Sequence, residues 1–264
     1  MRKCKSIRTG VLLTFRTHPW ADMLRLKRCR TELAERLLVA RKRHSVPILN
    51  YLVLPDSVAV LVLPKALGSA SALAGHVRGT LAASHARRTA RSGPFWQGKV
   101  RYTLVQGEVA LRSCVLALAM GPVASELALH PCEYRWSGYA ELVGLRKRYR
   151  ILDHARLRTL FRCEGDPQLH AHAAERTETA TKGATVPVCQ WARHLAVATN
   201  PWIQAAAEAI PRPFRRVTAF GGPECNGAVG AIATSEPNRR RYLPQFFGRS
   251  DFPGATGSSQ TLSY

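Results

Sequence analysis

The sequence has few acidic residues and no long apolar run. Asp and Glu together number 17 among 264 residues, against 39 Lys and Arg, so the formal net charge is +22. Such an excess of positive charge favours a polyanionic partner, most often nucleic acid and less often an anionic membrane surface. No apolar stretch reaches the roughly 20 residues of a membrane-spanning helix. The apolar run at 11–15 is too short for the core of a signal peptide, and we therefore expect a soluble, cytoplasmic protein.

Paired cysteines and phosphate-binding loops are also missing. The seven cysteines are scattered, and no two of them form a CxxC pair. This pattern argues against a disulfide framework and against a structural zinc site, so we expect free thiols in a reducing cytosol. No glycine-rich loop of the kind that cradles phosphates is present either.

The most informative stretch that is present runs from residue 48 to residue 64. Two short runs rich in Val, Leu and Tyr are separated by Pro55, Asp56 and Ser57. Apolar runs of this length bounded by turn-forming residues are typical of paired, buried strands. On the second strand Ser57 and Ala59 are two residues apart, so we expect their side chains to point to the same face of the sheet.

The periodicity of the chain predicts its fold class. Strands are expected at 10–17, 48–54, 57–63 and 100–105. Helices are expected between residues 22 and 47, at 67–91 and at 108–120, with a further short helix at 152–162. This order predicts an α+β fold: a ferredoxin-like βαββαβ sandwich with a four-stranded antiparallel sheet, helices on one face, and an additional C-terminal helix.

The character of the chain changes near residue 165. Lys and Arg exceed Asp and Glu by 19 in residues 1–164 but by only 3 in residues 165–264. We predict one domain over 8–164 and a C-terminal extension over 165–264 that is first partly helical. From residue 211 onward Pro, Gly and Ser interrupt any periodicity, so this tail is expected to be poorly ordered.

Four stretches, in the same order and on the expected elements, resemble the REP-associated tyrosine transposases of bacteria, which belong to the single-tyrosine HUH transposases. Gly10–His18 is similar to the first strand of the family. Leu54–Val62 (LPDSVAVLV) is similar to the family's MPNHVHLLV, and Gly93–Val100 (GPFWQGKV) to its GxLWQGRF. Residues 120–123 and 136–139 are similar to its LNPVRAG and PWSSY motifs. The resemblance covers about residues 8–160.

The resemblance implies a DNA-cleaving chemistry whose residues are replaced here. In the family, two histidines in a His-x-His motif hold a divalent metal such as Mg²⁺ or Mn²⁺, and a helix-borne tyrosine attacks the scissile phosphate of single-stranded DNA. At the matching positions this chain has Ser57, Ala59 and Ala117. Alanine offers neither a ligand atom nor a nucleophile, so we expect no catalytic residues, no metal and no cofactor at this site.

The basic positions match the family better than the catalytic ones. The resemblance implies a partner of hairpin or single-stranded DNA, and a monomer or homodimer. Phosphate contacts need charge more than a unique geometry, so DNA binding can persist without cleavage. The candidate DNA-binding residues lie on the second helix, the WQG segment and the third helix: Arg78, Arg87, Arg88, Arg91, Trp96, Gln97, Lys99, Arg101 and Arg112. The alternative is a merely solvated basic face. For Trp96 itself, we favour packing between helix and sheet over stacking on a base.

Other functions remain open at this stage. An active nuclease could use displaced residues such as Tyr102 or His172, and the single His-x-His of the chain is His170-Ala171-His172. We interpret that pair as a chance placement, because it lies in a polar segment rather than on a strand. A ferredoxin-like sheet also suits single-stranded RNA, so an RNA-binding or regulatory module is a further possibility, as is a decayed gene product.

Overall fold

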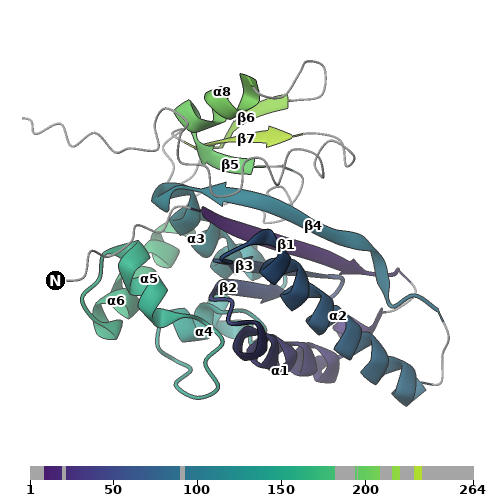
Figure 1. Ribbon diagram of the computed structural model, residues 1–264. Helices are drawn as coiled ribbons and strands as arrows, with labels where there is room; N and C mark the ends of the chain where they lie inside the picture. The colour runs from purple at the N-terminus through teal and green to yellow at the C-terminus, as the bar shows by residue number, and fades with distance from the viewer. Residues whose placement is uncertain are drawn as a thin grey trace, which may run out of the picture.

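The structure is a computed structural model that describes residues 9–19, 22–89, 93–181, 194, 196–208, 216–220 and 229–233. Its first elements are β1 (Thr9–Thr17), α1 (Lys27–His44), β2 (Ile48–Val53), β3 (Ser57–Val62), α2 (Leu67–Thr89), β4 (Trp96–Gln106) and α3 (Glu108–Ala124). The 3-10 turn η1 (Asp22–Arg25) precedes α1. The predicted βαββαβ order is therefore present in the α+β fold that the structure shows (Figure 1).

The second half of the chain adds helices and further strands. The turn η2 (Pro131–Glu133) is followed by α4 (Tyr139–Leu142), α5 (His154–Phe161) and α6 (Asp166–Thr181). After these come β5 (Ala196–Thr199), α8 (Asn200–Glu208), β6 (Arg216–Phe220) and β7 (Val229–Ala233). None of the described helices is both long and apolar enough to cross a membrane.

The prediction of a four-stranded antiparallel sheet was wrong in strand number and in direction. The sheet has seven strands in the order β2-β3-β1-β4-β5-β7-β6. Neighbours among the first four strands are antiparallel, but β5 joins β4 in parallel, with Leu104 opposite Ala196 and Val105 opposite Val197. The sequence pattern missed these strands because β5 to β7 are only four or five residues long.

The predicted poorly ordered tail also needs correction, because β6 and β7 fall within it. They pair antiparallel with each other, and β7 pairs with β5. Residues 211–215, 221–228 and 234–264 of that tail lie outside the described residues. The predicted division at residue 164 stays a prediction, although the sheet itself continues across it from β4 to β5.

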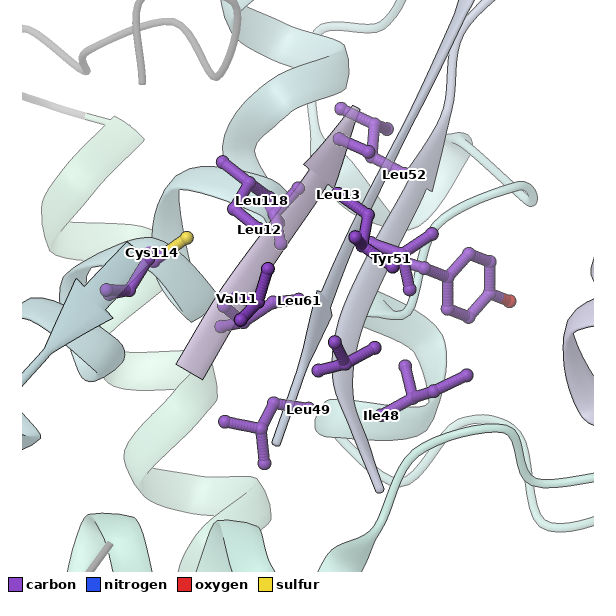
Figure 2. Close-up of a cluster of buried hydrophobic side chains, with 14 of the residues drawn as sticks. Val11, Leu12, Leu13, Ile48, Leu49, Tyr51, Leu52, Leu61, Cys114 and Leu118 are labelled. Atoms are coloured by element: carbon purple, nitrogen blue, oxygen red, sulfur yellow. The ribbon is translucent and has the colours of Figure 1, made fainter. Parts of the chain in front are cut away.

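Helices pack on both faces of the sheet, not on one as predicted. On one face Asn50 of β2 donates from Nδ2 to the carbonyl oxygen of Val115 in α3, at 2.7 Å. On the other face the indole nitrogen of Trp96 in β4 donates to the carbonyl oxygen of Arg78 in α2, at 2.9 Å, and α1 contacts α2. Figure 2 shows side chains of β1, β2 and β3 beside those of α3.

The central hairpin is buried as predicted. Every residue of β2, and every residue of β3 except Ser57, lies in the core. Burying a Val or Leu side chain contributes about 1.5–3 kcal/mol relative to leaving it exposed, so this hairpin is a main source of stability. β3 is an inner strand, and its partners on either side are β2 and β1.

The segment after α3 covers the outer edge of β2. Val53 donates its N–H to the carbonyl oxygen of Trp136, and Gly138 donates to that of Tyr51. Gly138 is required here because a Cβ at this position would lie 2.1 Å from Oδ1 of Asn50. An open strand edge invites pairing with other chains, and this segment prevents such pairing.

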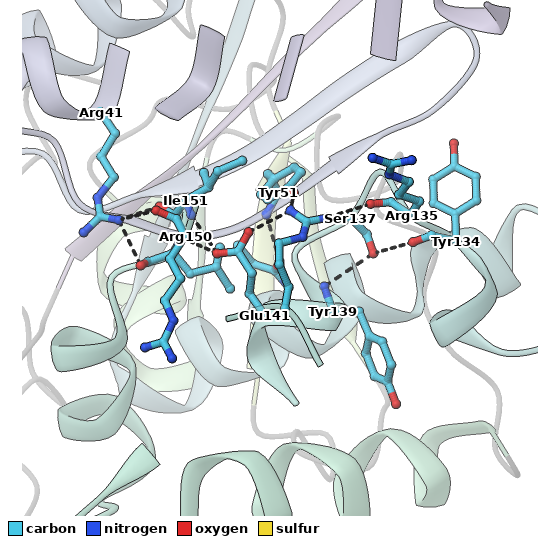
Figure 3. Close-up of polar contacts among 12 residues, drawn as sticks. Arg41, Tyr51, Tyr134, Arg135, Ser137, Tyr139, Glu141, Arg150 and Ile151 are labelled. Carbon is cyan, nitrogen blue, oxygen red and sulfur yellow. Dashed lines mark hydrogen bonds and ion pairs between the residues drawn. The ribbon is translucent and has the colours of Figure 1, made fainter. Parts of the chain in front are cut away.

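A buried carboxylate holds this segment together (Figure 3). The side chain of Glu141 is fully buried and forms an ion pair with Arg146 at 2.9 Å. Its Oε2 accepts hydrogen bonds from the N–H groups of Ile151 and Leu152, at 2.7 and 2.9 Å. Burial raises the pKa of Glu141, although these hydrogen bonds and Arg146 oppose the shift. Arg146 also donates to the hydroxyl of Tyr51, whose pKa burial raises to about 12.

Replacing Glu141 by Ala should destabilise the fold by about 2–4 kcal/mol, because it leaves the N–H groups of Ile151 and Leu152 buried without an acceptor and the partly buried Arg146 without its ion-pair partner. Urea unfolding followed by circular dichroism measures the loss. Glu35→Ala is the matched control, because Glu35 is exposed on α1 and should change stability by no more than about 0.5 kcal/mol. Equal losses in the two variants would contradict this role of Glu141.

Candidate nucleic-acid interface

Ser57 and Ala59 lie on the sheet face that α3 covers. A Cβ built on Gly10 of β1 would contact both Leu111 of α3 and Leu61 of β3, so these side chains share one face. Side chains alternate along a strand, which places Ser57 and Ala59 on the same face as Leu61. Ala117 lies on α3 and packs against the core. Ser57, Ala59 and α3 thus lie on the same side of the sheet, and their correspondence to a catalytic site stays a prediction.

Strand register places two rows of side chains beside them. Arg16 of β1 lies between Ser57 of β3 and Gln97 of β4. In the next row Thr14 lies between Ala59 and Arg101. Arg16, Gln97 and Arg101 are exposed, whereas Ala59 is only 7% exposed. We call this end of the sheet the basic corner, defined by Arg16, Asp56, Ser57, Gln97, Lys99 and Arg101.

Electrostatics at the basic corner are dominated by guanidinium groups and one carboxylate. Arg16 forms an ion pair with Asp56, and the hydroxyl of Ser57 donates to Oδ1 of Asp56 at 2.8 Å. Partial burial acts to raise the pKa of Asp56, but the hydrogen bonds from Arg16 and Ser57 outweigh it and the pKa lies below its usual value. Asp56 is therefore ionised near neutral pH and offsets the charge of Arg16.

Two side chains of β3 at this end of the sheet offer one oxygen atom between them. The Ser57 hydroxyl is engaged by Asp56, and Ala59 has no ligand atom. Among the described residues, the group of three side chains with metal-ligand spacing lies elsewhere, between α5 and α6. The chemistry available at this corner is the binding of anions by exposed cations.

Two predicted DNA-binding residues on this side of the fold pack against each other. Trp96 is 9% exposed and contacts the rings of Phe15 and Phe95. Arg78 lies over the Trp96 ring, at 5.7 Å from its centroid, and donates to the carbonyl oxygen of Gly98 at 2.8 Å. Burial lowers the pKa of Arg78. Arg78 and Trp96 thus fix the backbone of the segment that carries Gln97 and Lys99.

The remaining predicted residues fall into three groups. Arg88 pairs with Glu32 of α1 at 2.6 Å, and Arg112 donates to the carbonyl oxygen of Leu160 at 3.2 Å. Arg87, Gln97, Lys99 and Arg101 are exposed. Arg91 lies outside the described residues. A role in DNA binding stays a prediction for every residue of the set.

Sequence reasoning missed Arg16. One signal was present in the sequence: alternation along the first strand places Thr14 and Arg16 on the same face of the sheet. The missing information was the pairing of β1 with β3, which brings Arg16 opposite Ser57.

The displaced residues considered for an active nuclease lie apart from the basic corner. Tyr102 pairs with Leu13, next to Arg101 on β4, and so faces the opposite side of the sheet. His170 contacts the ring of His154, whereas His172 contacts that of Phe161. Residues two apart on a helix point in different directions at 3.6 residues per turn, so His170 and His172 do not form a chelating pair.

The Arg88–Glu32 pair predicts a pH-dependent stability. Burial acts to raise the pKa of Glu32, but hydrogen bonds from Ser84, Arg88 and Arg36 lower it overall. A lowered folded-state pKa means that the ionised pair stabilises the fold above the ordinary glutamate pKa of about 4.3. That contribution is lost as pH falls through the folded-state value. Urea unfolding should therefore show the unaltered chain more stable than Glu32→Gln at pH 7, with a smaller difference at acidic pH, and a constant difference would contradict this.

Comparisons with known proteins give one similar solved structure. No family model matches the chain, and no curated protein matches it. The solved structure is that of a REP-associated tyrosine transposase bound to a REP hairpin. It is 14% identical, with a TM-score of 0.41, and the match covers 56% of this chain and 87% of that chain. A similarity of this size does not establish a shared function.

Proposed function

We propose that the chain binds hairpin or single-stranded DNA through the basic corner and lacks the strand-cleaving chemistry of the HUH transposases. One observation carries the proposal. Three exposed cations lie on the two strands that follow β3 across the sheet, Arg16 on β1 and Lys99 and Arg101 on β4, and on β3 itself Ser57 and Ala59 replace the two imidazoles. The site thus has cations that can bind phosphate, but its β3 positions lack the imidazoles that would bind a metal.

The overall charge supports a nucleic-acid partner. The net charge of +22 is concentrated before residue 165, in the part of the chain that builds the basic corner. Cations that neutralise phosphates release counterions from nucleic acid, and this term supplies most of the non-specific affinity. Gln97 adds a side-chain amide that can donate to a phosphate or a base edge.

The local geometry argues that the corner is a fixed surface. Gly98 has a φ of +61° and begins a bulge opposite residues 14–16 of β1. The guanidinium of Arg78 holds the Gly98 carbonyl oxygen, and the buried Trp96 fixes the start of β4. We assign Arg78 and Trp96 to positioning, and Arg16, Gln97, Lys99 and Arg101 to contact with the nucleic acid.

The missing chemistry follows from the side chains themselves. A divalent metal at this face would need at least two ligands from β3, and Ser57 and Ala59 provide one weak oxygen donor between them. Ala117 has no nucleophilic atom. We therefore expect this chain to bind DNA without cleaving it.

The double variant Lys99→Ala/Arg101→Ala should bind hairpin and single-stranded DNA more weakly than the unaltered chain. Loss of two phosphate contacts should also flatten the dependence of log K on log salt by about 1.4, at about 0.7 for each contact with a single strand. Gel shifts with labelled oligonucleotides at several salt concentrations measure both quantities. Hairpin RNA and duplex DNA are run beside them, and tighter binding to RNA would favour an RNA-binding module instead.

Two controls test whether the position of the charge matters. Lys147→Ala/Arg148→Ala removes the same charge from an exposed loop and should change affinity less than the double variant at the corner. Asp56→Asn removes the carboxylate that neutralises Arg16 and should strengthen binding. If the loop variant loses as much affinity as the corner variant, the basic corner is not the interface.

The unaltered chain should form no covalent adduct with single-stranded DNA in Mg²⁺ or Mn²⁺. Denaturing gels of labelled DNA after incubation reveal such an adduct. The variant Ser57→His/Ala59→His/Ala117→Tyr restores two imidazoles and a phenol, and it should gain metal-dependent nicking. The matched control Ala59→His/Ala117→Tyr lacks one of the two imidazoles and should gain less nicking activity. An adduct formed by the unaltered chain would refute the loss of cleavage.

A further inference from the structure

Three side chains with metal-ligating atoms meet between α5 and α6, away from the basic corner. They are His154 at the start of α5, Asp166 at the start of α6, and His170 one turn later on α6. Their candidate ligand atoms all lie within 4.8 Å of one another. Asp166 and His170 are four residues apart on one helix, a spacing that places both side chains on the same face.

Three imidazole nitrogens of this cluster are buried without a hydrogen-bond partner among the described residues. The side chain of His154 is 8% exposed, and neither of its ring nitrogens has a hydrogen-bond partner among the described residues. Nε2 of His170 is also buried without one. An unpaired buried polar atom costs free energy, so three such atoms around one carboxylate are an arrangement that a ligand would complete.

The spacing fits a small divalent metal ion. Zn²⁺ binds imidazole nitrogen and carboxylate oxygen at about 2.0–2.2 Å, so neighbouring ligand atoms of a tetrahedral site lie about 3.3–3.6 Å apart. Nδ1 of His154 lies 3.8 Å from Oδ1 of Asp166. This separation is too long for a hydrogen bond but close to the edge of such a tetrahedron. The three ligand atoms lie within 4.8 Å of one another, so binding would require the side chains to move closer together.

Two arginines compete for the same carboxylate. Arg158 contacts Oδ1 of Asp166, and Arg150 contacts Oδ2 at 3.3 Å. Each carboxylate oxygen has further lone pairs, so a metal on Oδ1 leaves the Arg150 contact in place. The nearby positive charge weakens cation binding, and a moderate affinity is therefore expected.

We propose that His154, Asp166 and His170 form a site for a divalent transition metal of the Zn²⁺ class, with water as the fourth ligand. Two imidazoles and one carboxylate are a donor set that suits Zn²⁺ and related ions rather than Ca²⁺. The ion joins the first turn of α5 to the first two turns of α6. This site is independent of nucleic-acid binding at the basic corner, and neither proposal needs the other.

Metal titration of the full chain tests the site. After treatment with a chelator and dialysis, calorimetric titration with Zn²⁺ should show one site per chain, and Co²⁺ should give the visible absorption of a tetrahedral nitrogen and oxygen site. His170→Ala should weaken Zn²⁺ binding by at least about 10-fold, because changes even to outer-shell partners cost about 10–100-fold. Asp166→Asn should weaken binding as well.

His172→Ala is the matched control. His172 lies on the same helix but contacts Phe161 instead of the cluster, so this variant should keep the affinity of the unaltered chain. Cys132→Ser tests an alternative ligand pair, because Sγ of Cys132 lies 2.8 Å from Nδ1 of His130. Far-ultraviolet circular dichroism of each metal-free variant checks that it is folded. If His170→Ala does not fold, His154→Gln tests the loss of an imidazole ligand instead.

Each outcome of these titrations either supports or overturns the metal site. Equal Zn²⁺ affinity in the unaltered chain and in folded His170→Ala, or the absence of saturable binding, overturns the proposal. A thiolate-to-cobalt charge-transfer band, or loss of binding in Cys132→Ser, also overturns it by placing the metal on a cysteine. Retained binding in His172→Ala and Cys132→Ser with loss in His170→Ala establishes the site.

Discussion

The buried carboxylate of Glu141 is the interaction on which the second half of the domain depends. Segment 134–153 covers the edge of β2, yet it contains only one short helix and little regular hydrogen bonding of its own. Glu141 accepts from two backbone N–H groups of this segment, and Arg41 of α1 donates to three of its carbonyl oxygens. Side chains thus satisfy backbone groups that a strand would otherwise pair. The start of α5, and with it the His154 cluster, is placed by this arrangement.

The first half of the fold could be predicted from sequence because its elements carry strong local signals. The run 48–63 is long, apolar and interrupted by a turn, and α1 has a regular apolar stripe of Cys29, Leu33, Leu37 and Ala40. Strands β5 to β7 were missed because runs of four or five residues carry little periodicity. Their pairing depends on partners far away in the sequence, and no local pattern encodes such a contact.

The candidate site was predictable in position but not in composition. The spacing of Ser57 and Ala59 was enough to place both on one face, whereas Arg16 entered the site only through strand register. Trp96 and Arg88, in contrast, were predicted to contact DNA. A basic or aromatic residue in a charged segment looks available in the sequence, but Trp96 is buried and Arg88 pairs with Glu32. The cluster joins His154 to residues 12 and 16 positions later in the chain, and this proximity depends on the turn between α5 and α6.

The short pairing of β4 with β5 has a consequence for solubility. β4 spans 11 residues, but its described partners in β5 reach only Leu104 and Val105. Among the residues that the structure describes, the preceding part of β4 has no strand partner on this side, and an open edge of this kind could recruit another chain. Lys99, Arg101 and the bulge at Gly98 lie on that part, and charges and bulges on edge strands oppose aggregation. The same cations that suit a phosphate backbone therefore also keep two copies of the sheet from joining edge to edge.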